Sequence, residues 1–483
     1  MATTTSVVQE VHVPALQPER FKGLLPESAY ARFEQGIQRA RELLDGRVVW
    51  NLNSTAAGGG VAEMLRSFVA YSRGAGIDMR WGVISGDPEF FVVTKRIHNF
   101  LHGDSGDGGA LGPREKEIYC AVTERNAASL VEVVRSEDVL ILHDPQTAGM
   151  VPRLEETGAT VVWRCHIGAE HLNEYVEQAW DFLQPLAEKA DVCVFSRHAY
   201  VPAWATRIRT EIIQPSIDAF SPKNQDLEPA AQGAILAQSR LVRVDTPSDA
   251  LPVFERQDGS PGRVDREARV TSETGPPAVD DPLVVQVSRW DRLKDPIGVM
   301  LGFAQHVPAE TGAHLMLAGP DVEGVADDPE GAEILREVED RWRALPDATR
   351  ARIHLARLPM ADIDENAAMV NALQRHATVI VQKSLVEGFG LTVAEGMWKA
   401  RPVVASGVGG INDQIVDGVN GVLLQDPADL EAFGAEVTGL LHEPEQAREM
   451  GRAARAHVCS HFLVDRHALQ YVALFDELLK KRG

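Results

Sequence analysis

The chain has 483 residues, a length that predicts two or three domains, and its 44% hydrophobic and 24% charged residues are typical of a soluble globular protein. Acidic residues outnumber basic ones by 70 to 48, which gives a net charge of -22. This charge repels nucleic acid and anionic lipid, so we expect no nucleic-acid partner and no membrane partner. The four cysteines share no short spacing that would indicate a zinc site or a disulfide framework. With no signal-peptide pattern and no apolar run near the roughly 20 residues of a membrane span, we expect a cytoplasmic protein.

The first 224 residues are expected to hold an arm, a helix and one α/β domain. Residues 1–45 have the pattern of a polar arm and a helix, and residues 46–224 alternate short apolar strands with amphipathic helices. This alternation predicts a parallel sheet with helices on both faces. The expected strands are Arg47–Asn51, Met79–Ile84, Asp138–Leu142, Thr160–Trp163 and Asp191–Phe195, and the expected helices include Val61–Ser72, Pro113–Arg135 and His171–Lys189.

The alternation of strands and helices stops at residues 225–281 and resumes at residue 282. The intervening stretch is rich in proline, glycine, serine and mixed charge, as in an interdomain linker or a surface insertion. Residues 282–460 form a second α/β series, and residues 461–483 are expected to be a helix that can pack back on the N-terminal domain. The expected strands of the second series are Leu283–Val287, His314–Leu317, Arg352–Leu355, Thr378–Gln382, Pro402–Ala405 and Gly421–Leu424.

The predicted fold class is therefore α/β, with two doubly wound Rossmann-like domains facing a cleft. In such folds, ligands bind at the C-terminal ends of the parallel strands. Candidate site residues are accordingly those that directly follow a predicted strand.

The most informative segment, Ser384–Met397, follows a buried strand and opens a helix. Gly388 and Gly390 allow a ligand to approach the backbone closely. Phe389, Gly390 and Leu391 would present backbone N–H groups at the helix N-terminus, where an anion or a sugar oxygen can bind. This segment, including Leu391, is therefore a candidate site for an anion or a sugar.

Two glutamates belong to the same segment. Glu387 precedes the helix and Glu395 lies eight positions later, which places both carboxylates on broadly the same side at different depths. Such a pair suits the hydroxyl groups of a sugar and of a ribose. The alternative is a capping Glu387 and a solvated Glu395, because the helix dipole favours a glutamate at this place in any case.

A basic pair, Arg289 and Lys294, follows the first strand of the second series. A planar guanidinium supplies bidentate contacts and an ammonium supplies a point charge, and together they suit a diphosphate leaving group. Two neighbouring basic residues are unusual in an acidic protein, which favours a role in binding an anion. The alternative is that both are ordinary solvated surface side chains.

Two further candidates follow strands of the first series. Gly58, Gly59 and Gly60 lack the lysine of a P-loop and the spacing of a dinucleotide fingerprint, but their amides can approach a phosphate or an acceptor sugar. His166 can hydrogen-bond a sugar hydroxyl or polarise a reacting centre, or it can be a structural histidine. No spacing of residues indicates a metal site.

Taken together, these motifs resemble the retaining GT-B glycosyltransferases of the glycogen-synthase-like group. The spacing of Glu387 and Glu395, the pair of Arg289 and Lys294 and the N-terminal glycine loop stand in the order that this group shows. A closer resemblance is to the trehalose glycosyltransferring synthases and the related retaining trehalose phosphorylases. The segments that carry it are Asn51–Glu63, Gly86–Asn99, His143–Gln146, Trp163–His166 and Gln382–Gly410.

The resemblance implies a role for each candidate residue. The implied roles are diphosphate binding for Arg289 and Lys294, donor-sugar binding for Glu387 and the amides of Gly388, Phe389 and Gly390, ribose binding for Glu395, and contact with the sugar near its reacting carbon for His166.

The resemblance further implies glucosyl transfer, with retention, from a nucleoside diphosphate glucose to glucose, giving trehalose. The partners would be a small-molecule sugar nucleotide and a sugar acceptor, and a homodimer is a compatible assembly. No cofactor is obligatory, because the basic pair takes the place of a metal, although Mg is compatible with the site. The alternatives are a retaining trehalose phosphorylase, another sugar-nucleotide-dependent glycosyltransferase and a non-catalytic sugar-nucleotide binder. A dinucleotide-dependent oxidoreductase is disfavoured, because no G-x-G-x-x-G fingerprint follows a strand.

Overall fold

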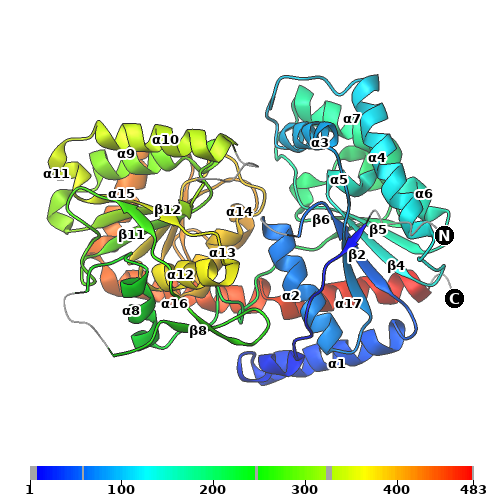
Figure 1. Ribbon diagram of the computed structural model, residues 1–483, viewed down its shortest axis with the longest axis horizontal. Coiled ribbons are helices and arrows are strands. Elements are labelled where there is room, and N and C mark those ends of the chain that lie inside the picture. The colour runs from blue at the N-terminus through cyan, green and yellow to red at the C-terminus, as the bar shows by residue number, and fades with distance from the viewer. Residues whose placement is uncertain (1–7, 57–58, 245–248, 323–328, 481–483) are drawn as a thin grey trace. The chain divides into compact units, whose positions relative to one another are not determined.

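The computed structural model describes residues 8–56, 59–244, 249–322 and 329–480. The chain divides into two compact units (Figure 1). Unit 1 comprises Met1–Ser216 together with Phe462–Gly483, and unit 2 comprises Ile217–His461. Unit 1 is therefore discontinuous in the chain, because unit 2 lies between its two segments.

In the described part of unit 1, seven strands form one sheet in the order β1-β3-β2-β4-β5-β6-β7. Neighbouring strands run parallel except at one edge, where β1 pairs antiparallel with β3. Every residue of β2, β4, β5 and β6 is buried, as expected when helices cover both faces of a parallel sheet. The strands are β1 (Gln9–Glu10), β2 (Val49–Asn53), β3 (Met79–Val83), β4 (Val139–His143), β5 (Thr160–Cys165), β6 (Val192–Phe195) and β7 (Thr210–Ile212).

The connections of this sheet reverse direction at β2, which lies between β3 and β4. Ligands of doubly wound folds bind at such a switch point, so the ends of β2 and β4 are where a site is expected. The α-helices of unit 1 are α1 (Glu27–Leu43), α2 (Gly60–Gly74), α3 (Pro88–Leu101), α4 (Pro113–Val131), α5 (Pro145–Ala148), α6 (Val151–Glu155), α7 (Glu174–Ala187) and α17 (Val464–Lys480), and its 3-10 helices are η1 (Pro18–Gly23), η2 (His198–Tyr200) and η3 (Ala203–Arg207).

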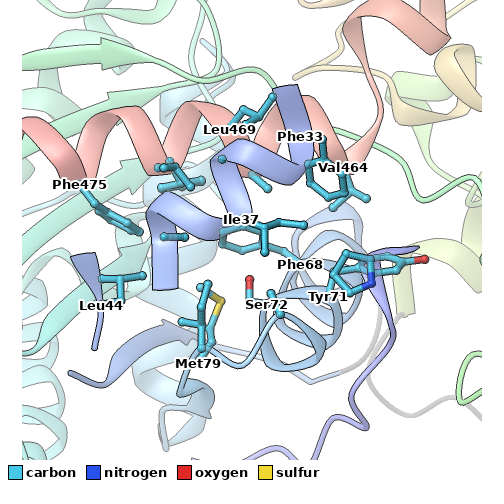
Figure 2. Close-up of a pocket in the computed structure, with 18 residues that line it drawn as sticks. Phe33, Ile37, Leu44, Phe68, Tyr71, Ser72, Met79, Val464, Leu469 and Phe475 are labelled. Carbon is cyan, nitrogen blue, oxygen red and sulfur yellow. The ribbon is translucent and has the colours of Figure 1, made fainter. Parts of the chain in front are cut away.

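The helix expected at residues 461–483 is α17, which packs on α1 and α2 of unit 1 (Figure 1). A Cβ atom at Gly36 would lie 2.1 Å from a methyl carbon of Leu469, so glycine allows α1 and α17 to cross closely. Figure 2 shows Phe33, Phe68, Leu469 and Phe475 around an apolar cavity of about 40 Å³ at this crossing. Helix α17 is thus part of the core of unit 1, although it follows unit 2 in the chain.

In the described part of unit 2, a second sheet has seven strands in the order β10-β13-β12-β11-β14-β15-β16. From β13 to β16 the strands are parallel and follow the order common to dinucleotide-binding domains, with the switch point between β11 and β14. The strands of unit 2 are β8 (Val253–Glu255), β9 (Pro261–Arg263), β10 (Arg269–Thr271), β11 (Leu283–Val287), β12 (His314–Pro320), β13 (Ile353–Leu358), β14 (Val379–Gln382), β15 (Val403–Ser406) and β16 (Val422–Leu424).

Helices flank this second sheet as they do the first. The α-helices of unit 2 are α8 (Pro229–Gln238), α9 (Pro296–His306), α10 (Pro329–Arg343), α11 (Asp347–Arg350), α12 (Ile363–His376), α13 (Leu391–Trp398), α14 (Ile411–Gln414), α15 (Leu430–His442) and α16 (Pro444–His461), and its 3-10 helices are η4 (Arg292–Lys294) and η5 (Ala309–Thr311). Across the described residues of both units, no helix combines the length and apolar character that a membrane crossing requires.

The stretch 225–281, expected to be a linker or an insertion, is an integral part of unit 2. It contributes α8, the β8–β9 hairpin and β10, which pairs antiparallel with β13 at the edge of the main sheet. Arg256 of this stretch forms a 2.8 Å ion pair with Asp362, and Arg266 pairs with Glu365 of α12. Glycine and proline residues that suggested a linker belong to the β8–β9 hairpin. Unit 2 begins at Ile217 rather than near residue 225.

Candidate active site

The switch point of unit 2 brings together the two motifs that the sequence singled out there. The loop after β11 carries Arg289 and Lys294, and the loop after β14 carries Glu387. The ammonium of Lys294 lies 2.5 Å from Oε2 of Glu387, and the hydroxyl of Ser384 donates to the same oxygen over 3.3 Å. The Lys294 and Glu387 side chains are mostly buried, with exposures of 17% and 10%. A cation and a carboxylate far apart in the sequence therefore form one local group.

Arg289 lies in the same loop but is open to solvent. Its side chain is 60% exposed, and its guanidinium forms a 2.8 Å ion pair with Asp291 two positions later. An exposed ion pair of this kind contributes little to stability. The guanidinium can therefore exchange its carboxylate partner for a ligand anion at small cost.

Sequence reasoning missed Lys383, which fixes the end of this loop. Its side chain is fully buried, and its ammonium contacts Oδ2 of Asp295 and the carbonyl oxygen of Pro427 at 2.5 Å. Asp295 has a left-handed backbone (φ 48°) and caps α9 by accepting from the N–H of Gly298 over 2.9 Å. The pair thus ties the strand that precedes Glu387 to the loop that carries Lys294. Only the burial of Lys383 reveals this role, because a lysine after a strand has no distinctive pattern.

The turn before α13 is held in one shape by its carbonyl groups. The carbonyl of Gly388 accepts from the N–H of Gly410 over 3.0 Å, and the carbonyl of Phe389 accepts from the Gln414 amide over 2.5 Å. Gly390 is left-handed (φ 83°), and a Cβ atom there would lie 3.0 Å from Ile411.

Helix α13 begins at Leu391, and its N-cap residue is Gly390. Because glycine has no side chain, Gly390 cannot cap the first backbone N–H groups of the helix, which point out of its N-terminus. Because helix N-termini attract anions, this turn stays the predicted site for an anion or a sugar oxygen.

Glu395 has a different environment from Glu387. Its side chain is 2% exposed and its Oε1 lies 3.1 Å from the ammonium of Lys223. The neighbouring Asn224 is anchored on α13, because its carbonyl accepts from the Trp398 indole over 2.9 Å. The alternative of a solvated Glu395 is therefore wrong. Sequence reasoning also missed Lys223, which precedes α8. Only its contact with Glu395 in the structure identifies it as a candidate site residue.

The glycine loop of unit 1 lies at the start of α2. Gly59 is left-handed (φ 80°) and is the N-cap of that helix, and Gly60 is its first residue. Gly58, the third glycine of the predicted loop, lies outside the described residues. The two described glycines follow β2, one of the strands at the switch point of the first sheet.

His166 lies just after β5, and protein groups engage both of its ring nitrogens. Its Nε2 lies 3.0 Å from Nδ1 of His143, and its Nδ1 accepts from Nε of Arg164 over 3.4 Å. Burial, and then the charge of Arg164, hold the pKa of His166 well below its usual value. The ring is therefore neutral near pH 7 and does not offer a substrate an unengaged nitrogen in this structure.

Asp144, which sequence reasoning left without a role, contacts His166 directly. Its Oδ1 accepts from the backbone N–H of His166 over 2.7 Å. Burial raises the pKa of the Asp144 carboxyl to about 7, although the His166 N–H and Arg164 act to lower it. Its backbone (φ 65°, ψ 175°) is in a region that residues other than glycine rarely adopt. A strained backbone and a raised pKa at a strand end are features of functional carboxylates.

Two sequence families match the chain. The trehalose synthase N-terminal domain matches residues 51–202, and the glycosyl transferases group 1 family matches residues 273–457. Trehalose synthase of Pyrococcus horikoshii is 33% identical over 467 residues, which cover 95% of this chain and 96% of the relative. The chain belongs to the trehalose synthase family of glycosyltransferases. Trehalose synthase of Rubrobacter xylanophilus is 34% identical over 463 residues, with 95% of this chain and 96% of the relative covered.

This trehalose synthase family member is also similar to a phosphorylase and to solved structures. Trehalose phosphorylase of Pleurotus pulmonarius is 25% identical over 439 residues, which cover 87% of this chain and 56% of the phosphorylase. The UDP-forming α,α-trehalose-phosphate synthase of Burkholderia xenovorans superposes with a TM-score of 0.65 at 14% identity, covering 89% of this chain and 100% of that one. Sucrose-phosphate synthase of Thermosynechococcus elongatus gives 0.61 at 17% identity, covering 90% and 100%. The predicted GT-B glycosyltransferase fold with two Rossmann-like domains is confirmed, and so is a trehalose-related glycosyltransferase activity.

Proposed function

We propose that the protein transfers glucose, with retention, from a nucleoside diphosphate glucose to glucose and so forms trehalose. The observation that supports this most is the contact of Lys294 with Glu387 at the switch point of unit 2. It places a cation suited to a phosphate beside a carboxylate suited to a sugar hydroxyl. The relatives named trehalose synthases supply the choice of product.

Unit 2 binds the donor in this proposal. Arg289 and Lys294 hold the diphosphate and stabilise the negative charge that develops as it leaves, and Glu387 and the N-terminus of α13 bind hydroxyls of the transferred glucose. Because two cations and a helix terminus already face the anion, no cofactor is obligatory, and Mg is an optional addition. Glu395 binds the ribose by exchanging its contact with Lys223 for two hydroxyl groups.

Unit 1 binds the acceptor sugar. Asp144 accepts a hydrogen bond from a sugar hydroxyl, and His166 keeps that carboxylate in place through its backbone N–H. The acceptor hydroxyl attacks the anomeric carbon from the face that the diphosphate leaves, and the departing phosphate oxygen takes its proton. One C–O bond forms as another breaks, so the anomeric configuration is retained.

A retaining trehalose phosphorylase is the second candidate, and its support is the relative from Pleurotus pulmonarius. In that reaction inorganic phosphate would occupy the place of the diphosphate. The synthases favour the first candidate, because they match at 33–34% identity along 96% of their length, whereas the phosphorylase matches at 25% along 56%.

A product assay separates the two candidates. The protein is incubated with glucose and, in turn, UDP-, ADP- and GDP-glucose, and a parallel reaction contains trehalose and inorganic phosphate. We expect trehalose and a nucleoside diphosphate from at least one donor, and none with the Glu387→Gln variant. Glucose 1-phosphate from trehalose and phosphate, with no trehalose from any sugar nucleotide, would establish the phosphorylase instead.

A further inference from the structure

A fully buried cation lies two positions before His166 on β5. Arg164 has an exposure of 0%, and its guanidinium donates to the Tyr471 hydroxyl at 2.5 Å, to Nε2 of His467 at 3.3 Å and to the carbonyl of Ile213 at 3.1 Å. All of these partners are uncharged, and no ion pair in the described part of the chain involves Arg164. Burying a cation whose hydrogen-bond partners are all uncharged costs folding free energy. Such a residue calls for a functional explanation.

The hydrogen bonds of Arg164 determine where the proton of His166 lies. A guanidinium can only donate, so Nδ1 of His166 must accept from Arg164 Nε, and the proton of the neutral ring is on Nε2. That Nε2–H donates to Nδ1 of His143 over 3.0 Å, and His143 in turn donates from Nε2 to Oδ1 of Asn51 over 3.2 Å. One cation therefore fixes the tautomers of two histidines at the ends of β4 and β5.

The same rule applies on the side of Arg164 that faces α17. Nε2 of His467 accepts from Arg164, so His467 carries its proton on Nδ1 and donates to the hydroxyl of Ser216 over 3.0 Å. The His467 and Tyr471 rings, one turn apart on α17, stack with centroids 5.2 Å apart. The guanidinium carbon of Arg164 lies 5.5 Å from the centroid of the Tyr471 ring. Helix α17 thus holds the guanidinium with two side chains.

We propose that Arg164 is a positioning residue that keeps His166 in its Nε2–H tautomer, and that α17 supports it through His467 and Tyr471. The inference rests on the proposed function only in taking His166 and Asp144 as parts of the sugar-binding site. The residue whose ring is fixed in this way also donates its backbone N–H to Oδ1 of Asp144 over 2.7 Å. The helix that follows unit 2 in the chain is therefore a working part of the site in unit 1.

The tautomer of His166 can be measured without substrate. In protein labelled with 15N-histidine, long-range proton–nitrogen spectra distinguish the two neutral tautomers from the imidazolium. The His166 signals among the 15 histidines are those lost in His166→Gln. We expect the pure Nε2–H tautomer in the unsubstituted protein and a mixture of tautomers in Arg164→Met, which keeps the length of the side chain but has no donor. If Arg164→Met does not fold, Arg164→Lys, which lacks the Nε donor, takes its place.

Kinetics test the support that α17 gives. Tyr471→Phe keeps the buried ring and removes only the hydroxyl that Arg164 contacts. We expect kcat to fall on the order of tenfold, as for other groups that orient a functional histidine, with KM for the sugar nucleotide unchanged. Leu478→Ala is the matched control, because Leu478 is a buried apolar residue two turns further along the same helix and has no group that could hydrogen-bond to Arg164. It should lower the melting temperature and leave kcat of the folded protein unchanged.

Two results would overturn the inference. One is a His166 ring that is protonated on Nδ1, or that keeps the same single tautomer when Arg164 is replaced. The other is an equal effect of Tyr471→Phe and Leu478→Ala on kcat, which would make α17 a packing element alone. Since the spectra require no turnover, a failure of the proposed reaction and a failure of this inference are separate results.

Discussion

The ammonium of Lys294 lies 2.5 Å from Oε2 of Glu387, although 93 positions separate the two residues in the chain. The contact joins the loops that follow β11 and β14 at the switch point of unit 2. Because the partner of each charge lies in the other loop, a substitution of either residue alters both the diphosphate end and the sugar end of the proposed donor site.

Removing either basic residue should slow the reaction. We expect Arg289→Ala and Lys294→Ala each to raise the barrier by about 2–4 kcal/mol, because each removes positive charge from the place where the leaving group becomes more negative. Arg292→Ala is the matched control for Arg289, since the Arg292 side chain is in the same loop and has the same 60% exposure, but pairs with Glu337. Steady-state kinetics on the three variants checks this. Equal losses in Arg289→Ala and Arg292→Ala would remove Arg289 from the site.

The two glutamates should affect different parts of the donor. We expect Glu395→Ala to weaken the binding of a nucleoside diphosphate, whereas Glu387→Gln should lower turnover and sugar binding, because only Glu395 is assigned to the ribose. Calorimetric titration of UDP, ADP and GDP into each variant measures the difference. If Glu387→Gln lost diphosphate affinity and Glu395→Ala kept it, the two roles would be reversed.

Breaking the buried pair of Lys383 and Asp295 should destabilise unit 2. Lys383→Met leaves the Asp295 carboxylate without its cation, and we expect unfolding in urea to show a loss of about 3–5 kcal/mol. The double variant with Asp295→Asn should recover part of this loss, because asparagine tolerates the left-handed backbone and still caps α9. A double variant less stable than Lys383→Met would contradict this account.

Asp144 should make stability depend on pH. Its pKa in the folded protein, about 7, lies above the ordinary value of 3.8, so the folded state holds this proton more tightly than the unfolded state does. The resulting stability is complete below about pH 4 and is lost as the pH rises to about 7, with an upper limit of about 4 kcal/mol. The loss of stability between pH 5 and pH 8, measured by urea unfolding, should be smaller in Asp144→Asn than in the unsubstituted protein, and a loss due to the buried Asp465, whose pKa is raised to about 6, should remain in both. An identical pH dependence of the two proteins would show that Asp144 does not titrate in this range.

Most of the two parallel sheets could be predicted from the sequence, because their central strands are short continuous apolar runs. Leu283–Val287 was placed at its observed limits, and the other predicted strands differ from the observed ones by only a few residues at their ends. The edge strands β1 and β10 were missed for a physical reason. In β1 and β10, most residues are exposed or half-buried, so they lack the apolar signal, and their pairing depends on a strand elsewhere in the chain.

The positions of candidate residues were predictable where a residue type sits at a strand end in a recognisable spacing, as for Arg289, Lys294 and Glu387, which follow β11 and β14. Asp144 and Lys383 could not be predicted, because their significance comes from burial and from partners in distant segments. Asp144 carries a raised pKa only because it is enclosed. Lys383 meets Asp295 across 88 positions, and no local pattern records that contact.

Because unit 2 is inserted between the two segments of unit 1, the chain of unit 2 is fully synthesised at the ribosome before that of unit 1. Unit 2 is one continuous stretch, Ile217–His461, and all of its strands emerge before residue 462. The strands of unit 1 are synthesised first, but the core of unit 1 is incomplete until α17 has been synthesised. This helix places Leu469 against Gly36 and the Tyr471 hydroxyl against Arg164. During that interval the face of α1 and α2 that α17 later covers is open to water and to chaperones. A chain released before residue 464 would contain every candidate residue of both units and still lack the α17 helix that unit 1 requires, so unit 1 can be complete only after α17 has been translated.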